Sequence, residues 1–330
     1  MKKFILVSVI WVLLMPCAVK ADAVFGNLAV VVPPDKAITE SELISIVVRL
    51  AGNAVDQLQI SVNNRKQPLT ARPYNQHYAC KDGIQLSYGL NKIKVVGLKD
   101  GKKVGEVNTQ VFYRTELAQT SSGVPPGFKQ YSFHVGSNEK TCTPCHQLEF
   151  NKSDAKTPSG EQSPCFTCHK KLLTNYIFVH GPAAVWSCLT CHEGKSRNPK
   201  LAVLKPDGKV CVNCHEYSWE NKKYQHGPTA AGSCTTCHNP HASNNANFLR
   251  LSPGDLCVAC HEDVLSRPHI LTGFSGNGHP VRKYPDPFNP GREFNCASCH
   301  NPHGGNSQRF LNGYDNSMEM QDFCMTCHKM

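Results

Sequence analysis

Apolar and polar side chains alternate along much of the first third of the chain, with the period of a β-strand that buries one face. The clearest runs are residues 43–50, 55–62, 93–98 and 107–113. Turn-forming pairs separate these runs, because Asn and Gly tolerate positive φ; they are Asn63-Asn64, Asp82-Gly83 and Asp100-Gly101. Short strands at this spacing predict a small β-sandwich over residues 24–115.

The first residues have the pattern of an export leader and not that of a folded domain. Lys2 and Lys3 precede an apolar run over residues 4–15, and small residues follow, so we predict a signal peptide over residues 1–23. A membrane-spanning helix needs about 20 apolar residues, more than this run provides. The alternative is a lipoprotein acylated at Cys17. Pro16, directly before this Cys, fits the lipoprotein signal poorly.

Residues 116–133 form a predicted linker, because residues 120–127 are polar and rich in Gly and Pro. Beyond it, the sequence Cys-x-x-Cys-His occurs eight times. In chain order, motifs 1 to 8 are Cys142, Cys145 and His146; Cys165, Cys168 and His169; Cys188, Cys191 and His192; Cys211, Cys214 and His215; Cys234, Cys237 and His238; Cys257, Cys260 and His261; Cys296, Cys299 and His300; and Cys324, Cys327 and His328.

This motif is the attachment site of c-type haem. The two thiols form thioethers with the porphyrin, and the His becomes the proximal iron ligand. A zinc ribbon or a disulfide framework has no use for a His after every second Cys. We therefore expect eight covalent haems. Because bacteria attach such haems outside the cytoplasm, we expect export to the periplasm, with the cell surface or extracellular space as the alternative.

The segment that carries the motifs is short for its cofactors. Residues 134–330 supply roughly 25 residues per motif, too few for an ordinary core. We expect stacked porphyrins to form the core, with one helical turn at each motif and little other regular structure. The predicted fold class is thus multidomain, a small β-sandwich followed by a haem-packed array.

The motifs follow a repeat. The first cysteines of motifs 1 to 6 are 23 residues apart, and another His precedes alternate motifs by eight residues. We read this as four two-haem units, which begin at His134, His180, His226 and His279; the fourth is stretched by residues 281–294. A fixed period predicts that each unit contacts its neighbours in the same way, so that electrons can pass along a line.

The remaining histidines are candidates for the distal iron ligands. Seven lie in the haem region, namely His134, His180, His226, His241, His269, His279 and His303. Two nitrogen ligands keep an iron low-spin and close it to substrates. Seven histidines leave one of eight irons unmatched. The options are His77, a methionine near the last motif (Met318, Met320 or Met330), a His from a neighbouring subunit, or an open iron.

The C-terminal half resembles the doubled Cys-x-x-Cys-His family of multihaem cytochromes. The resemblance rests on motif 5 followed by Asn-Pro-His241 and by Phe248-Leu249-Arg250, and on motif 7 followed by Asn-Pro-His303 and by Phe310-Leu311. It implies electron transfer in bacteria that respire external acceptors. The first two units depart from it, since Glu149 and Lys195 stand three residues after His146 and His192.

A second resemblance concerns the β-region. Residues 89–101 resemble the late strands of an immunoglobulin-like or fibronectin-like module, which implies a docking or spacing role. Outside every motif stands Cys80, which we expect to be a small buried side chain, with a surface thiol as the alternative.

These patterns favour an electron carrier over an enzyme. A multihaem reductase of a small oxyanion is one alternative, although no motif has Lys in place of its His; a subunit of an extracellular filament or outer-membrane conduit is another. We expect redox partner proteins, such as quinol-oxidising membrane cytochromes or outer-membrane conduits, and allow self-association. The net charge of +10 is offset by haem propionates, so we expect no nucleic-acid binding. Basic residues predicted to pair with propionates are Lys170, Lys171, Lys195, Arg197, Lys222 and Lys223.

Overall fold

The computed structural model describes residues 28–328 except 116, 118–122, 141, 144–145, 149–161, 193–198, 218–219, 267–268, 270–278, 280, 282–283, 288 and 290. The predicted signal peptide and the lipobox cysteine therefore lie outside the described residues. Within the described part of the chain, no helix is long and apolar enough to cross a membrane.

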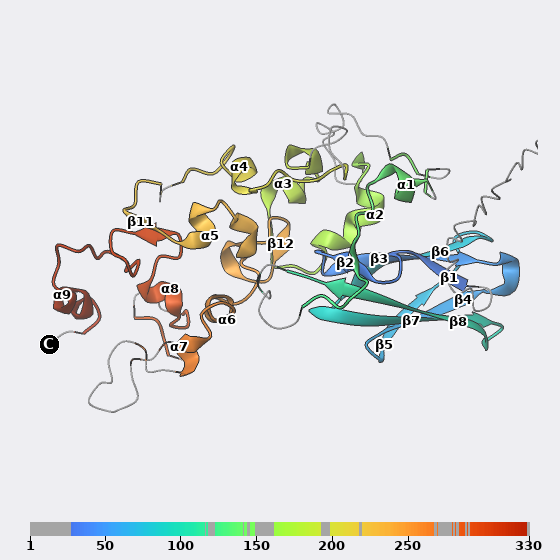
Figure 1. Ribbon diagram of the computed structural model, residues 1–330, viewed down its shortest axis with the longest axis horizontal. Helices are drawn as coiled ribbons and strands as arrows, with labels where there is room; N and C mark the ends of the chain where they lie inside the picture. The colour runs from blue at the N-terminus through green and yellow to red at the C-terminus, as the bar shows by residue number, and fades with distance from the viewer. Residues whose placement is uncertain are drawn as a thin grey trace, which may run out of the picture.

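Two sheets build the N-terminal region (Figure 1). The smaller sheet has the order β1-β3-β6, and the larger has the order β5-β4-β7-β8-β2-β9. The strands are β1 (Leu28–Val32), β2 (Ala37–Thr39), β3 (Leu43–Leu50), β4 (Gln57–Val62), β5 (Arg65–Ala71), β6 (Tyr78–Gln85), β7 (Gly89–Lys99), β8 (Lys102–Tyr113) and β9 (Lys129–Gln130). A 3-10 turn, η1 (Gly52–Ala54), lies between β3 and β4. The predicted β-rich region is confirmed.

The core of this region comes from the alternation that the sequence shows. Ile46 and Val48 of β3 face inward against Ile60 of β4 and Val95 of β7, and all four are essentially buried. The same alternation corrects our expectation for Cys80. Its neighbour Ala79 is 0% exposed, and because successive strand residues point to opposite faces, Cys80 lies exposed.

The large sheet ends in a strand from the predicted linker range. β9 pairs in parallel with β2, with Ala37 opposite Lys129 and Ile38 opposite Gln130. The Tyr131 amide adds a hydrogen bond of 3.0 Å to the Ile38 carbonyl oxygen. The chain is therefore fixed to the sheet immediately before the haem-motif region begins.

The region from residue 134 onward contains short helices, 3-10 turns and two-residue strands, as predicted (Figure 1). These are α1 (Gly136–Glu139), α2 (Phe166–His169), η5 (Lys170–Leu173), β10 (Phe178–Val179), α3 (Gly181–Ala184), η6 (Cys188–Thr190), α4 (Gly208–Cys211), β11 (Tyr224–Gln225), α5 (Gly227–Ala230), η7 (Cys234–Thr236), β12 (Ala242–Ser243), η8 (Ala246–Phe248), α6 (Pro253–Val258), α7 (Asp263–Ser266), α8 (Cys296–Cys299), β13 (Gly304–Gly305) and α9 (Met320–Met325).

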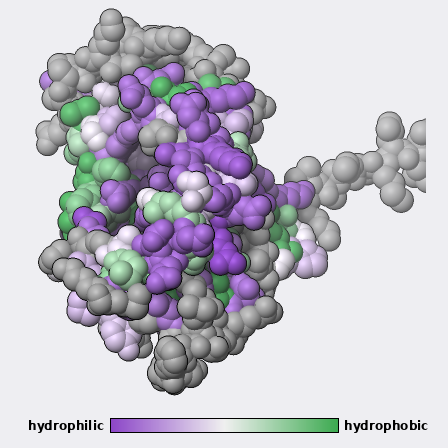
Figure 2. Space-filling view, turned by 90° about the vertical axis from the view of Figure 1, so that its left-hand side faces the viewer, coloured by the Kyte–Doolittle hydropathy of each residue, from purple (hydrophilic) through white to green (hydrophobic). Residues whose placement is uncertain are grey.

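Burial differs sharply between the two regions. Of the described hydrophobic residues that are buried, the haem-motif region contributes only Leu148, Ala242, Leu256, Phe294 and Leu311, whereas the rest lie in the β-region. The exposed end near α9 is mostly hydrophilic, with smaller hydrophobic patches (Figure 2). Protein side chains alone thus form little core here, which agrees with a region whose interior is completed by cofactors.

Side chains join the two regions directly. The Tyr176 hydroxyl donates a hydrogen bond of 2.9 Å to Glu42. Gly83 of β6 faces the aliphatic stem of Lys171, and a side chain there would meet that stem at 3.1 Å. A groove of about 920 Å³ runs beside these contacts, lined by Tyr88, Tyr113 and Arg250 among others.

Candidate haem-binding sites

All eight motifs share one local fold. In each, the backbone amide of the motif His donates to the carbonyl oxygen of the first Cys four residues earlier, at 2.9–3.0 Å. Because residues four apart lie on the same face of a helical turn, this bond brings the first Cys and the His of each motif together, as a single porphyrin requires. Motif 1 makes this bond at 2.9 Å, like the others, between His146 and Cys142.

The second cysteine of a motif has to reach the porphyrin edge, and the described ones are open enough to do so. Cys168 and Cys260 lie exposed, and Cys237 is half-buried. The backbone is fixed at these positions: the Cys260 amide donates to the carbonyl oxygen of the first Cys of its motif at 3.3 Å, and the Cys237 carbonyl oxygen accepts from the Arg250 amide at 2.9 Å. Cys145 lies outside the described residues, so its attachment to haem stays a prediction.

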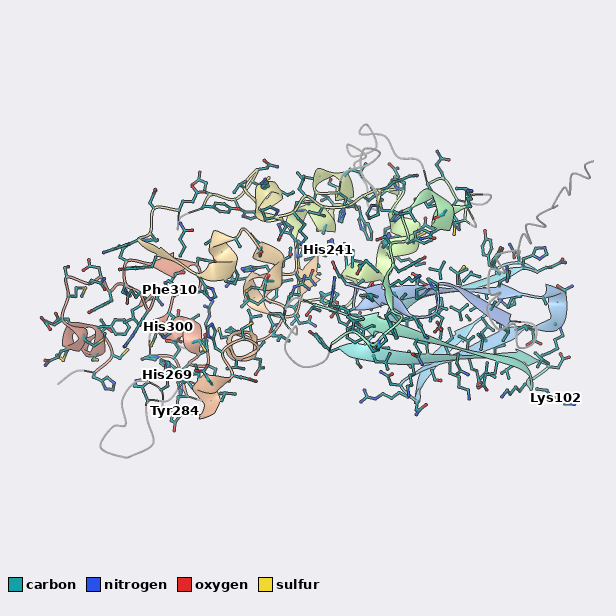
Figure 3. The ribbon with its side chains drawn as sticks, in the orientation of Figure 1. Lys102, His241, His269, Tyr284, His300 and Phe310 are labelled. Atoms are coloured by element: carbon teal, nitrogen blue, oxygen red, sulfur yellow. The ribbon has the colours of Figure 1, made fainter. Side chains whose placement is uncertain are left out.

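Seven of the eight motif histidines face a second histidine. The pairs, with the distances between ring centroids, are His169 with His134 (6.2 Å), His192 with His241 (6.0 Å), His215 with His180 (6.0 Å), His238 with His303 (6.1 Å), His261 with His226 (6.1 Å), His300 with His269 (6.0 Å) and His328 with His279 (6.2 Å). Every non-motif His of the haem region takes part once. Figure 3 shows one pair, His269 and His300, brought together from separate segments.

The uniform spacing fits a metal between the rings. Imidazole nitrogens bind metals at about 2.0–2.1 Å, so two rings that face one metal from opposite sides have their centroids about 6 Å apart. Direct ring packing would not demand the same distance in seven places. The donor set and the spacing therefore fit a haem iron at each pair.

Hydrogen bonds hold several of these rings by Nδ1. His192, His238 and His300 each donate from Nδ1 to the carbonyl oxygen nine residues later, at 2.6–2.7 Å, on Leu201, Asn247 and Arg309. His180 donates in the same way to Pro240, at 3.0 Å. A carbonyl only accepts, so Nδ1 carries the proton and Nε2 keeps the lone pair that a metal needs.

His134 is held by a carboxylate instead. Its Nδ1 lies 3.1 Å from Glu139 Oε1, and the other carboxylate oxygen accepts from Lys200 at 2.8 Å. Glu139 is only 3% exposed. A buried carboxylate behind a ligating imidazole fixes the ring and makes its free nitrogen more basic.

Burial also favours the neutral, ligating form of six of these rings. It lowers the pKa of His241 to about 4, with help from His192 and Arg250. Burial likewise lowers the pKa of His134, His169, His226, His269 and His303. A protonated imidazole has no lone pair for iron, so the environment favours the state that binds metal.

The model of the doubled CXXCH motif matches residues 180–218, 226–265 and 287–330. These segments contain motifs 3 to 8 and most of the histidines that pair with them. The doubled CXXCH motif therefore recurs three times between residues 180 and 330. These motifs indicate a multihaem cytochrome with covalently bound haem c.

Other comparisons reach less of the chain. No curated protein matches it. Solved structures with partial likeness are an engineered protein (14% identity, TM-score 0.24, 27% of this chain and 20% of that one), an endo-β-1,4-mannanase from Thermotoga petrophila (13%, 0.23, 28% and 20%) and a putative β-galactosidase from Bacteroides fragilis (18%, 0.20, 26% and 12%). The matches span a fifth or less of those chains.

The doubled CXXCH units pair their histidines by a simple rule. In each unit, the His that opens the unit faces the second motif of that unit, as His180 faces His215. The first motif of units 2 and 3 is paired by the next unit, through the His three residues after that unit's first motif. His241 serves His192 in this way, and His303 serves His238.

The Asn-Pro-His segments also connect neighbouring doubled CXXCH units through short strand pairs and ring contacts; we call each such strand pair a clasp. Strand β12 follows His241 and pairs with β10, which leads directly into His180 at the start of the preceding unit; β13 follows His303 and pairs with β11, which leads into His226 in the same way. The ring of Phe248 packs on His180 at 5.4 Å, and Phe310 packs on His226 at 5.9 Å. The spacing that these two copies share thus has a structural cause: each segment supplies both a histidine and a strand to its neighbour.

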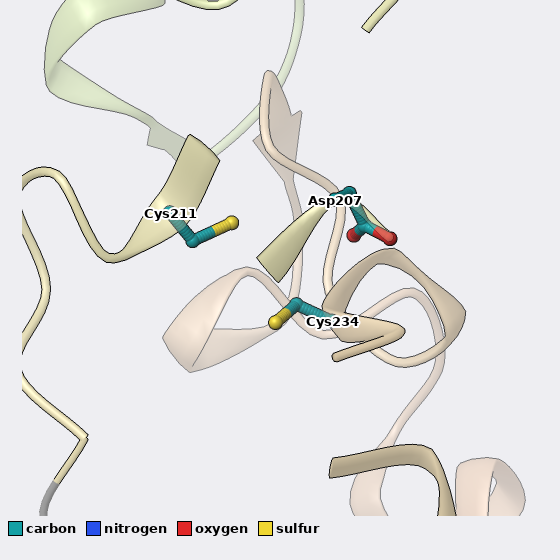
Figure 4. A group of neighbouring side chains, drawn as sticks. All are labelled: Asp207, Cys211 and Cys234. Atoms are coloured by element: carbon teal, nitrogen blue, oxygen red, sulfur yellow. The ribbon is translucent and has the colours of Figure 1, made fainter. Parts of the chain in front are cut away.

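Consecutive motifs approach each other through their cysteines. Cys165 lies close enough to Cys188 to raise the pKa of the Cys188 thiol, and burial together with Cys234 raises the pKa of the Cys211 thiol. Asp207, Cys211 and Cys234 lie within 4.8 Å of one another (Figure 4). Since both thiols belong to doubled CXXCH motifs, this group is not a separate metal site. Buried Asp207 accepts from the Thr235 amide at 2.7 Å and so fixes motif 5 against motif 4.

Among the described residues, His146 alone of the motif histidines has no histidine partner. His77 makes no ring contact with it; the His77 amide instead donates to Asn75. The methionine alternative fails at the last motif, because His279 faces His328 there. Met330 lies outside the described residues, as do Lys195 and Arg197 among the basic residues predicted to pair with propionates.

Proposed function

We propose that this protein transfers electrons through eight covalently attached haems, seven of which have two axial histidines. The observation that carries the proposal is the set of seven His–His pairs at one spacing, 6.0–6.2 Å. Bound haem supplies one-electron redox chemistry at each site. The chain supplies the ligands and the order of the sites.

The histidine pairs suit electron transfer rather than substrate turnover. Two nitrogen ligands fill both axial positions, so the iron changes charge with little movement and offers no place for a substrate. The Nδ1 hydrogen bonds to carbonyl oxygens fix the orientation of each ring, for example His238 to Asn247 at 2.7 Å. A fixed ring reduces the rearrangement that accompanies each change of charge.

The order of the motifs supports a continuous path. The pairs Cys165–Cys188 and Cys211–Cys234 place motif 2 against motif 3 and motif 4 against motif 5. Electrostatic contact between Cys191 and Cys214 relates motif 3 to motif 4, and contact between Cys299 and Cys327 relates motif 7 to motif 8. These contacts support electron transfer in chain order from motif 2 to motif 5 and from motif 7 to motif 8.

The cellular setting follows from the leader and the cofactor. Residues 1–23 have the pattern of an export signal, and covalent haem attachment takes place outside the bacterial cytoplasm. We place the protein in the periplasm, in anaerobic or extracellular respiration. Its partners are then redox proteins that donate electrons at one end of the array and accept them at the other.

Intact-mass measurement and a redox titration together test this function. The mature chain from a host that attaches c-type haem should exceed its polypeptide mass by eight haems. Its reversible titration should require eight electrons per chain, with a low-spin oxidised spectrum for at least seven haems. Fewer attached haems, or a majority of high-spin irons, would contradict the proposal.

A further inference from the structure

Motif 1 is built like the other motifs but lacks their second histidine. His146 donates to the Cys142 carbonyl oxygen at 2.9 Å, the geometry that all eight motifs share. All sixteen histidines lie within the part of the chain that the structure describes, and seven pairs use fourteen of them. His146 and His77 remain, and no ring contact joins them. The unmatched iron is therefore that of motif 1.

The pairing rule explains why this motif differs. The first motif of units 2 and 3 receives its partner from the next unit, from the position three residues after that unit's first motif. Applied to unit 1, the rule points to the residue three after His192. That residue is Lys195, where the following units have His241 and His303.

Lysine is a weaker iron ligand than histidine at neutral pH. The ammonium group is protonated, with an ordinary pKa of about 10.4, and has no lone pair to give to iron. The methionines of the described region do not substitute for it either: Met318, Met320 and Met325 lie at the α9 end, whereas motif 1 follows α1 beside the β-region (Figure 1).

A second observation concerns the surroundings of motif 1. The hydroxyl of Tyr131 is buried and has no hydrogen-bond partner, the one such side-chain atom among the described residues. Burial, together with the neighbouring Cys142, raises the pKa of Tyr131 to about 12. Buried donors are almost always satisfied, so a group bound at motif 1 is the candidate acceptor for this hydroxyl.

We infer that the iron of motif 1 is held by His146 alone and that its other face binds a small exogenous ligand, a diatomic gas or small anion. This inference rests on the proposed haem content. It adds a ligand-binding iron at the end of the array next to the β-region, in series with seven closed ones. That arrangement suits a terminal site at which electrons meet a small acceptor.

Carbon monoxide titration of the fully reduced protein tests this assignment. The wild type should bind one carbon monoxide per chain, and its oxidised spectrum should show one high-spin iron in eight. Lys195→His places a histidine where the later units have His241 and His303. This variant should bind no carbon monoxide. The matched control Lys102→His, on the distant β7–β8 hairpin (Figure 3), should still bind one.

Two further variants keep the test decisive. His134→Ala opens the iron of motif 2 and should raise binding to two per chain. The double variant that combines Cys142→Ala with Cys145→Ala should lose one haem by mass and all carbon monoxide binding, while the remaining seven haems stay low-spin and show that the array has folded.

Several outcomes would overturn the inference. Absence of carbon monoxide binding in the wild type means that the iron of motif 1 is filled. Binding that appears only in Lys195→Ala identifies Lys195 as the ligand, and binding that appears only on dilution identifies a second copy as its source. If Lys195→His still binds one carbon monoxide per chain, the open iron belongs to another motif. An unchanged eight-electron titration in each case would leave the proposed function standing.

Discussion

A single side chain that hydrogen-bonds the Nδ1 of a distal histidine can determine how tightly that histidine binds its iron. Glu139 is the clearest case, because its carboxylate holds His134 Nδ1 and is itself held by Lys200 at 2.8 Å. Most other held rings use backbone carbonyls, which substitution cannot remove. Glu139 therefore gives direct experimental access to the orientation of one distal histidine.

Glu139→Ala should loosen His134 without removing it. Loss of the partner behind a metal-bound His typically weakens its metal binding about 10–100-fold, so carbon monoxide should compete for motif 2 more effectively by that factor. The affinity is measured by titration of the reduced protein. Glu106→Ala is the control, since Glu106 pairs with Lys94 and Lys103 on the β-region surface. Equal affinities in both variants would show that Glu139 has no such role.

His180→Ala and His226→Ala should each open one iron. The structure assigns these rings to His215 and His261, at 6.0 and 6.1 Å. Each variant should gain one high-spin haem in electron paramagnetic resonance and bind one more carbon monoxide, with all eight haems still attached. Electron throughput should fall. If both spectra remain fully low-spin, the pairing of histidines described above is wrong.

At the scale of elements, two-residue strands join the haem units. β11 pairs with β13 so closely that only glycine fits at one position of β13. Gly304 has φ of +144°, and a Cβ there would lie 2.5 Å from the Tyr224 carbonyl oxygen. Such a short clasp has few contacts of its own, so it depends on the backbone approach that this glycine permits.

Gly304→Ala should separate the clasp between units 3 and 4. The backbone strain alone costs about 1–3 kcal/mol, and the collision with Tyr224 adds to it. Thermal melting followed at the haem absorbance should occur at a lower temperature. Gly123→Ala serves as the control, because open space surrounds Gly123. A melting temperature equal to that of the control would contradict the role of the clasp.

At the scale of the whole molecule, the two regions reach stability by different means. The β-region has a continuous apolar core in which residues such as Ile46 and Val95 are fully buried. Among its described residues, the haem-motif region has few buried hydrophobic side chains of its own. The first should therefore fold without haem, whereas the second should depend on haem attachment.

A fragment of residues 24–131, expressed in the cytoplasm, should show β-type circular dichroism and a cooperative melt. It ends after β9, so that β2 keeps its parallel neighbour. Ile46→Ala should cost this fragment about 2–5 kcal/mol of unfolding free energy, measured by denaturant titration, because it leaves a cavity in the core. A disordered wild-type fragment would show that the β-region relies on the haem array.

The sequence by itself determined the chemistry, the period and the strands. Each motif acts locally: in all eight copies the His amide donates to the carbonyl oxygen of the first Cys, four residues earlier, and this bond involves no distant residue. The alternation over residues 43–113 likewise records which face of each strand is buried. Haem c, the repeat of 23 residues and the β-rich region could be predicted for this reason.

Only the tertiary structure decided which histidine faces which motif. His303 meets His238 across a unit boundary, and His269 meets His300, although His241 and His303 lie only three residues from those motif histidines; nearness in sequence therefore does not identify the partner. The outward orientation of Cys80 depended in the same way on the phase of β6. Spacing reveals that ligands exist, but the packing of one unit on the next selects their partners, and this packing leaves His146 as the motif histidine without one.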